Sequence, residues 1–256
     1  LFRSALGEEI GAALGEEAAA QEVSVVLGPG LNMKRNPLCG RSFEYFSEDP
    51  YLAGKLAAGY IRGIQSKGVY VYLKHVALND SESSRRGVNT WLNEQTAREI
   101  YLEVADKAIT DGGAWSVMTG FNRWGATWCG ANANLLTGFL RGELGMRGMC
   151  ITDYSGSSKY MDLADGLIAG SDIWDSPDPT IHTTLAPKYE NDAYIVTEMR
   201  ESMHKILYTV ANSNAMNGWS SADRLKVITP WWKTALYALD TVLAVLTVLC
   251  IWRLVV

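Results

Sequence analysis

The sequence predicts an α/β fold, a partial (β/α)8 barrel of the TIM type that is followed by a single transmembrane helix. Short runs of apolar residues alternate five times with amphipathic segments between residues 23 and 212, as in a parallel sheet covered on both faces. Several of these runs end in polar or charged residues. The last 22 residues, 235–256, are apolar except for a few threonines, Asp240 and Arg253.

The alternation alone leaves two architectures open, because a doubly wound sheet produces the same pattern. Polar residues at the carboxyl ends of several strands favour the barrel, in which catalytic groups come from the ends of different strands. Only about five of the eight strands of such a barrel are recognisable, so we expect the others to precede residue 1. The chain also begins at Leu1, without an initiator methionine or a secretory signal, as a fragment does.

Each apolar run is expected to form a strand and each amphipathic segment a helix. A helix covers residues 2–22, and a strand at 23–28 ends in Gly28-Pro29-Gly30. After a polar loop at 32–47, Asp49 caps a helix that has Pro50 at its first position and ends near residue 66. Further strands are expected at residues 69–76, 115–121, 148–153 and 171–174, and further helices at 94–110, 134–144, 159–169 and 189–212.

We expect three parts: a globular domain at residues 1–213, a polar linker at 214–230 and a membrane anchor at 231–256. The 22 apolar residues span about 33 Å as a helix, enough to cross a hydrocarbon core. Trp231, Trp232 and Lys233 come directly before them, as interfacial residues do. The alternative is a buried C-terminal helix of a soluble domain, because Asp240 is costly inside lipid.

Composition argues against several classes of partner. A net charge of −5 and a pI near 5.3 leave no basic surface for nucleic acid. The four cysteines lack metal-ligand spacing, so we expect no metal site. We also expect no cofactor, because Gly28-Pro29-Gly30 lacks the third glycine and the following helix of a dinucleotide-binding loop.

The candidate catalytic residue is Asp153, which ends the strand expected at residues 148–153. A carboxylate at a strand exit is held rigidly toward a cleft, although a solvated loop residue or a helix cap is the commoner explanation. Lys74 and His75 end another strand, and both can reach one cleft only if that strand bends or ends there. An ion pair between Lys74 and a loop acid is the plain alternative for this lysine.

Five stretches resemble glycoside hydrolase family 3, the β-glucosidase and β-xylosidase family. They are LGPGLN at residues 27–32, RNPLCGRSFEYFSEDP at 35–50, KHVALND at 74–80, MTGFNR at 118–123 and ITDY at 151–154. The resemblance covers about residues 1–212 in the family's order. It implies a barrel enzyme that hydrolyses β-linked sugars with retention of configuration.

The resemblance also implies roles for individual residues. Asp153 stands at the position of the family's nucleophile, in Thr-Asp-Tyr instead of Ser-Asp-Trp. Basic side chains bind the hydroxyls of the terminal sugar and keep the nucleophile ionised. These basic residues are Arg41, Lys74, His75 and Arg85, and we expect Met118, Phe121 and Trp174 to line the same substrate pocket.

Two positions depart from the family's pattern. Phe121 replaces a common tyrosine, which removes a hydroxyl beside the nucleophile. The ending Ser171-Asp172-Ile173-Trp174 is unusual, and Asp172 is expected to remain within reach of the sugar pocket. The residues after Lys74-His75 resemble the glucosidase-like branch, not the N-acetylglucosaminidase branch.

The general acid is missing from the matched motifs. Retention requires a second carboxylate about 5 to 5.5 Å from the nucleophile. In the glucosidase-like branch a second domain supplies it, so we expect such a domain as a partner of this chain. Glu44, Glu48 and Glu82 are present, but position alone makes none of them the acid.

Three functions follow as hypotheses. The first is a membrane-anchored hydrolase that cleaves terminal β-linked glucosyl or related residues from oligosaccharides or glycosides. The second is a catalytically weak, membrane-tethered sugar-binding module that lacks the acid, and the third is a barrel enzyme that uses Lys74 for Schiff-base chemistry. The expected location is the cell membrane with the domain outside the cell.

Overall fold

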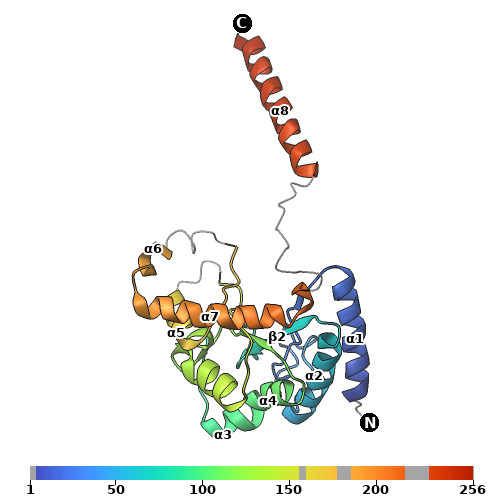
Figure 1. Cartoon of the computed structure of the whole chain (residues 1–256), viewed down its shortest axis with the longest axis vertical. Coiled ribbons are helices and arrows are strands. Elements are labelled where there is room, and N and C mark those ends of the chain that lie inside the picture. Colours follow the sequence, from blue (N-terminus) through green and yellow to red (C-terminus); the bar gives the residue numbers. More distant parts are fainter. Residues whose placement is uncertain (1–3, 156–159, 178–185, 217–230, 256) are drawn as a thin grey trace. The chain divides into compact units, whose positions relative to one another are not determined.

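The computed structural model of the chain describes residues 4–155, 160–177, 186–216 and 231–255. The chain divides into two compact units, Leu1–Asn217 and Gly218–Val256. The first unit contains the sheets and most of the helices (Figure 1).

The main sheet of the first unit has four parallel strands in the order β1-β2-β4-β7. An isolated parallel bridge between Ile151 and Ile173 continues it beyond β7. The strands follow one another in sequence order, without the reversal that defines a doubly wound sheet. Their bounds are Val25–Val26 for β1, Tyr70–Val76 for β2, Ser116–Thr119 for β4 and Cys150–Ile151 for β7.

Helices cover one face of this sheet. Val71, Leu73 and Val117 belong to one buried apolar cluster with side chains of these helices. Burying an aliphatic side chain of this size stabilises the fold by roughly 1.5 to 3 kcal/mol. The helical segments are α2 (Pro50–Gln65), the continuous run α3 (Glu94–Thr96), η1 (Ala97–Leu102) and α4 (Glu103–Thr110), and η3 (Asn134–Glu143).

Local sequence explains where α2 begins. The Asp49 side chain accepts a hydrogen bond from the backbone N–H of Leu52 at 2.7 Å, and Pro50 opens the helix. The carboxylate satisfies an N–H that has no partner inside the helix, and the proline ring fits the first turn. The cap predicted from the sequence is confirmed.

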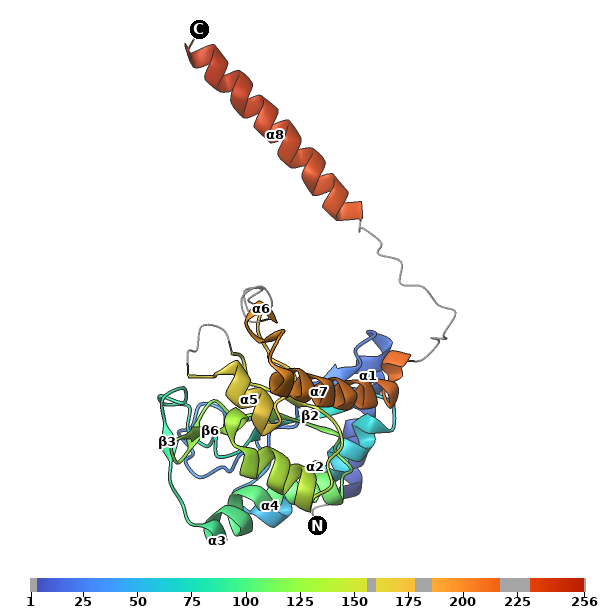
Figure 2. The same cartoon turned by 60° about the vertical axis from the view of Figure 1, so that its left-hand side comes forward.

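The long helix α7 (Ala193–Ala211) lies near the amino ends of the strands. Ile206 packs against the second apolar cluster, which includes Tyr70 and Met149. The backbone N–H of Met149, just before β7, donates to Thr209 Oγ1 at 3.1 Å. In both views α7 runs beside β2 (Figure 1, Figure 2).

Helix α1 (Ser4–Ala20) packs on α2 with unusually close backbones. A Cβ atom at Gly11 would lie 2.1 Å from the carbonyl oxygen of Tyr60, and one at Gly63 would lie 2.2 Å from that of Glu8. No side chain fits at either position. The two glycines therefore set the separation between the helices.

Several elements differ from the prediction. The helix expected at 189–212 is split into α6 (Ala186–Tyr189) and α7, because Asp192 caps α7 through the N–H groups of Tyr194 and Ile195. Asp162 likewise caps α5 (Leu163–Ala169), so this helix begins later than expected, and residue 159 lies outside the described residues.

A second, three-stranded sheet was not predicted. Its order is β3-β5-β6, with β5 and β6 antiparallel. Each strand has two residues, too few to show an alternating pattern. The bounds are Asn89–Thr90 for β3, Arg123–Trp124 for β5 and Thr127–Trp128 for β6, and the 3₁₀ helices are η2 (Cys129–Ala131) and η5 (Asn214–Met216).

The second unit contains helix α8 (Trp231–Val255). In the described part of the chain it is the one helix long and apolar enough to cross a membrane. Asp240 lies within it. Of the expected linker, residues 214–216 form η5, where the N–H of Asn214 donates to the carbonyl of Gly68 at 2.7 Å, and residues 217–230 lie outside the described residues.

Candidate active site

Asp153 lies two residues after the end of β7, and its backbone N–H donates to the carbonyl of Thr119 at the end of β4. Its side chain is 13% exposed. One carboxylate oxygen, Oδ1, accepts a hydrogen bond from the N–H of Tyr154 at 2.8 Å. The other, Oδ2, is buried and accepts no hydrogen bond from the described residues. One oxygen is therefore fixed and the other is available.

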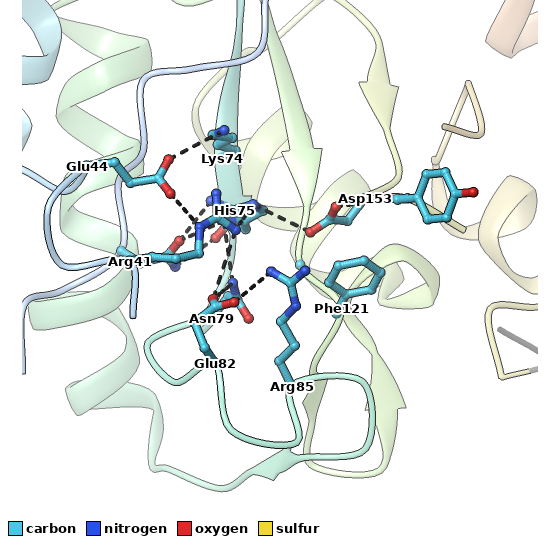
Figure 3. Close-up of polar contacts among 12 residues, drawn as sticks. Arg41, Glu44, Lys74, His75, Asn79, Glu82, Arg85, Phe121 and Asp153 are labelled. Carbon is cyan, nitrogen blue, oxygen red and sulfur yellow. Dashed lines mark hydrogen bonds and ion pairs between the residues drawn. The ribbon is translucent and has the colours of Figure 1, made fainter. Parts of the chain in front are cut away.

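Lys74 and His75 reach the same cluster as Asp153 from the end of β2. The register between β2 and β4 shifts between Lys74 and Val76, so the strand is irregular at this point. His75 Nε2 lies 3.5 Å from Asp153 Oδ2, and Lys74 Nζ lies 3.5 Å from Glu44 Oε2 (Figure 3). The irregular end of β2 thus allows the adjacent residues Lys74 and His75 to approach the same cluster of side chains.

His75 is held in one tautomer. Burial lowers its pKa well below the ordinary value, and Arg41, Lys74 and Arg85 lower it further, so the ring is neutral. Nε2 faces the donor Arg41 Nη1 at 3.0 Å and must accept. Nδ1 therefore carries the proton and donates to Asn32 Oδ1 at 3.1 Å. The 3.5 Å approach to Asp153 is consequently no ion pair.

The remaining charges come from two loops. Arg41 Nε donates to Glu44, and Arg41 Nη1 lies 4.0 Å from Glu82 Oε1. Arg85 Nη1 lies 2.8 Å from Glu82 Oε2. Figure 3 shows these side chains converging beside Asp153. Glu44 thus orients Arg41 and Lys74, while Glu82 orients Arg85 and the far side of Arg41.

The carboxylates in this cluster have opposite pKa shifts. Burial raises the pKa of Asp153 above its ordinary value, although the N–H of Tyr154 and the charges of Arg85 and Arg41 oppose the rise. Burial also raises the pKa of Glu44, but its contacts with Arg41 and Lys74 outweigh that effect, and the pKa is lowered. Glu44 is therefore unsuited to donate a proton.

The structure distributes the three expected pocket residues differently. Phe121 is 1% exposed, and the guanidinium of Arg85 lies 4.6 Å from its ring centroid. Met118 is buried in the cluster with Tyr70 and Met149, on the face of the sheet opposite α2. Trp174 lines a cavity of about 530 Å³ between α5 and α7, whose lining includes none of the basic side chains beside Asp153.

Asp172 does not reach the basic cluster, which corrects the sequence-based expectation. Its side chain is fully buried and lies 2.7 Å from Arg141 Nη2 and 3.2 Å from Lys205 Nζ. Its Oδ2 also accepts a hydrogen bond from the N–H of Cys150 at 2.8 Å. These partners lie on η3, α7 and β7, so Asp172 ties helices to the sheet.

Asn32 and Asn79 were not singled out by the sequence. Asn32 holds His75 through both ends of its amide, since Nδ2 donates to the backbone carbonyl at 3.0 Å and Oδ1 accepts from the backbone N–H at 2.9 Å. Asn79 Nδ2 lies 3.4 Å from Glu82 Oε1. Their places in the loops that follow β1 and β2 were the available signal. Within the described residues no group of three or more His, Cys, Asp or Glu side chains could hold a metal ion.

The fold and the site define an α/β protein with a recessed carboxylate that faces Lys, His and Arg side chains. The basic side chains can bind the hydroxyl groups of a ligand, and the carboxylate can attack one of its carbon atoms. The family described as "Glycosyl hydrolase family 3 N terminal domain" matches residues 3–205. The chain therefore belongs to glycosyl hydrolase family 3.

Individual relatives agree with this assignment. The chain is 46% identical over 168 residues to the thermostable beta-glucosidase B of Acetivibrio thermocellus, covering 66% of this chain and 22% of that protein. It is 44% identical over 146 residues to the exo-alpha-(1->6)-L-arabinopyranosidase of Bifidobacterium breve, covering 57% of this chain and 19% of that protein. The chain thus spans about a fifth of the length of these relatives.

Solved structures show the same fold. The beta-glucosidase of Bifidobacterium adolescentis superposes with a TM-score of 0.78 at 31% identity, covering 87% of this chain and 32% of that one. The beta-glucosidase 3B of Thermotoga neapolitana, solved in complex with glucose, gives 0.75 at 34% identity, covering 83% and 30%. The α/β fold is therefore that of family 3 beta-glucosidases.

Proposed function

We propose that this chain is the sugar-binding, nucleophile-bearing domain of a retaining glycoside hydrolase, which removes terminal β-linked glucosyl or related residues. The observation that carries the proposal is Asp153 Oδ2, which is buried, lacks a hydrogen bond among the described residues and lies among Arg41, His75 and Arg85. An unpaired carboxylate oxygen costs stability. It suits a nucleophile that must reach an anomeric carbon.

In the proposed reaction, Asp153 Oδ2 attacks the anomeric carbon while the bond to the leaving oxygen breaks. Arg41, Lys74 and His75 hold the hydroxyls of the terminal sugar, and the glycosyl ester on Asp153 is then hydrolysed by water. When the sugar is bound, His75 Nε2 accepts a hydrogen bond from a sugar hydroxyl in place of the one from Arg41 Nη1, because its Nδ1–H is committed to Asn32. Lys74 and Arg41 donate.

The general acid is proposed to come from a second domain outside this chain. Glu44 is bound to Arg41 and Lys74, and Glu82 is bound to Arg85. A general acid needs a raised pKa, whereas that of Glu44 is lowered. The relatives are about five times longer than the matched region, so they have room for such a domain.

The names of the relatives support hydrolysis over simple sugar binding. They are beta-glucosidases and an arabinopyranosidase, and one structure holds glucose. The Schiff-base alternative has less support, because an amine nucleophile needs an apolar or cationic neighbourhood and Lys74 faces the Glu44 carboxylate. A terminal glucosyl group is the substrate feature that these observations favour.

Covalent trapping tests the proposal. The intact protein is incubated with a 2-deoxy-2-fluoro-β-glucoside that has a good leaving group, and peptides are mapped by mass spectrometry. We expect a glycosyl adduct on Asp153 that is absent in Asp153→Asn. Asp165→Asn, which changes an exposed carboxylate on α5, is the matched control and should be labelled. An adduct on another residue contradicts the assignment, and glucose binding without turnover supports the sugar-binding module.

We further propose that α8 anchors the protein in the cell membrane with the domain outside, where polymer-derived glycosides occur. The length and apolar composition of α8 support this proposal. The protein should remain in membranes after alkaline carbonate washing, whereas a variant without residues 231–256 should not. External protease should digest the domain on intact cells, and its protection would contradict the orientation.

A further inference from the structure

A cluster of charged and aromatic side chains adjoins the candidate active site, and the proposed mechanism uses only part of it. Two guanidinium groups, those of Arg85 and Arg86, lie 4.6 and 5.0 Å from the ring centroid of Phe121. A third, that of Arg123, lies 4.4 Å from the ring centroid of Tyr160. The Tyr160 hydroxyl donates to the carbonyl of Phe121 at 2.9 Å, which joins the two stacks. We call these five residues the arginine–aromatic cluster.

The cluster borders the nucleophile. Phe121 and Asp153 follow the neighbouring strands β4 and β7, and Figure 3 shows the Arg85 guanidinium and the Phe121 ring next to the Asp153 carboxylate. Burial raises the pKa of Tyr160, Arg123 and Arg86 oppose that rise, and Asp153 adds to it. A ligand held by this cluster would therefore lie beside the anomeric carbon.

The charges of the cluster are only partly balanced. Arg85 is paired with Glu82 at 2.8 Å. Arg86 and Arg123 have no acidic partner within the described parts of the chain. Arg86 is exposed, and the Arg123 guanidinium donates to the carbonyl of Gly87 at 3.4 Å. The whole chain carries a net charge of −5, so this positive excess is local.

Arg86 and Arg123 stack on the Phe121 and Tyr160 rings, and this stacking leaves them able to bind a ligand. A guanidinium group that lies over an aromatic ring is fixed in orientation, and its N–H edge stays free. Such an edge matches the two oxygens of a carboxylate. By contrast, Arg41 and Lys74 already contact Glu44. Among the described basic residues of the site, Arg86 and Arg123 are therefore the ones that keep a positive charge available for a ligand.

We propose that Arg86 and Arg123 bind a carboxylate on the leaving-group side of the substrate, so that the site prefers glycosides with an acidic aglycone or an acidic second sugar. This inference rests on the proposed function, which assigns the terminal sugar to Arg41, Lys74 and His75. The inference adds acidic glycosides to the proposed substrates, a preference that assays with neutral glucosides alone would not detect.

The test is calorimetric binding to the intact protein carrying Asp153→Asn, so that turnover does not consume the ligands. One pair is 4-carboxyphenyl β-glucoside and its neutral isostere 4-carbamoylphenyl β-glucoside. The other is β-glucosyl-glucuronic acid and cellobiose, and glucose is the reference. We expect the acidic member of at least one pair to bind roughly three- to tenfold more tightly, less so at high salt. The pair that shows the preference identifies the carrier of the carboxylate.

The variants Arg86→Gln and Arg123→Gln should bring the affinity ratio of acid to neutral ligand close to one. Arg147→Gln removes the same charge from an exposed arginine before β7 and should leave the ratio unchanged. A ratio near one in both pairs overturns the inference, as does a preference that persists in both variants. Glucose binding without an acid preference defeats this inference alone, whereas failure of all ligands to bind defeats the sugar site on which it rests.

Discussion

Asp153 and Asp172 lie 19 positions apart, one shortly after β7 and the other in the segment that pairs with β7. Their carboxylates nevertheless differ in how many partners they have. Asp172 is fully buried, and both of its oxygens contact partners on Arg141, Lys205 and Cys150. Asp153 leaves one buried oxygen without a hydrogen bond among the described residues. A buried carboxylate whose two oxygens both have partners, as in Asp172, stabilises the fold. A buried carboxylate with one oxygen left free, as in Asp153, is available to react with a ligand.

The comparison has an energetic basis. A buried carboxylate with all its partners contributes to folding, and removal of one partner leaves an uncompensated charge. A buried oxygen without a partner lowers stability, and proteins keep such groups mainly at functional sites. The four experiments below test this contrast, beginning with the largest expected effect.

Replacing Asp153 by Asn in the intact protein should abolish most activity. Without the nucleophile we expect kcat on an aryl β-glucoside to fall by about 10⁴-fold, or about 5.5 kcal/mol. Because burial raises the pKa of Asp153, the fold favours the uncharged form, and ionisation at neutral pH costs stability. Asp153→Asn should thus be at least as stable in urea at pH 7. A large loss of stability would make Asp153 a structural residue like Asp172.

Replacing Asp172 by Asn should have the reverse effect, a loss of stability with little change in activity. Arg141 and Lys205 would face a neutral amide, and we expect the free energy of unfolding to fall by about 3 kcal/mol. Urea denaturation measures the change, and the folded fraction should retain its kcat. Asp165→Asn is the control, because its carboxylate is exposed on α5 and should change stability by less than about 1 kcal/mol. A collapse of kcat in folded Asp172→Asn would place this residue in the active site after all.

Replacing Glu44 by Gln tests an acid that neither attacks the sugar nor holds the fold together, but orients Arg41 and Lys74. Arg41 and Lys74 would lose their shared carboxylate, so KM for a glucoside should rise roughly three- to tenfold while kcat changes less. Glu48→Gln removes an exposed acid from the same loop and serves as the control. Equal kinetic changes in the two variants would contradict the positioning role.

Replacing Arg85 by Gln should have the smallest effect, a shift of the pH profile. Asp153 must be ionised to attack, so kcat/KM falls as the pH drops through its pKa. Arg85 lowers that pKa, and its removal raises it. The acid limb of kcat/KM should therefore move to higher pH in Arg85→Gln and stay in place in Arg147→Gln. A shift toward lower pH is incompatible with the described electrostatics.

The sequence located the central cluster because parallel strands bring their carboxyl ends together. Lys74 and His75 lie at the carboxyl end of β2, Asp153 comes shortly after β7 on the far side of β4, and Arg41 comes from the loop after β1. This geometry depends on strand order, which apolar runs and the family resemblance indicate. Asn32 follows the same logic and could have been included.

Other positions were not predictable from the sequence. Around Ile173 the sheet is continued by an isolated bridge, and so short a segment has no alternating pattern that would show which way Asp172 and Trp174 point. The break between α6 and α7 depends on Asp192, whose capping role competes with an apolar pattern that runs across it.

The fixed imidazole of His75 has a consequence for any acidic habitat. Because Asn32 occupies its one proton donor and guanidinium groups surround its lone pair, this ring cannot serve as a proton sensor. If Asp153 is the nucleophile proposed above, acidification would protonate it while His75 stays neutral. We then expect a sugar to remain bound at a pH that stops cleavage, and a return to neutral pH to restore turnover.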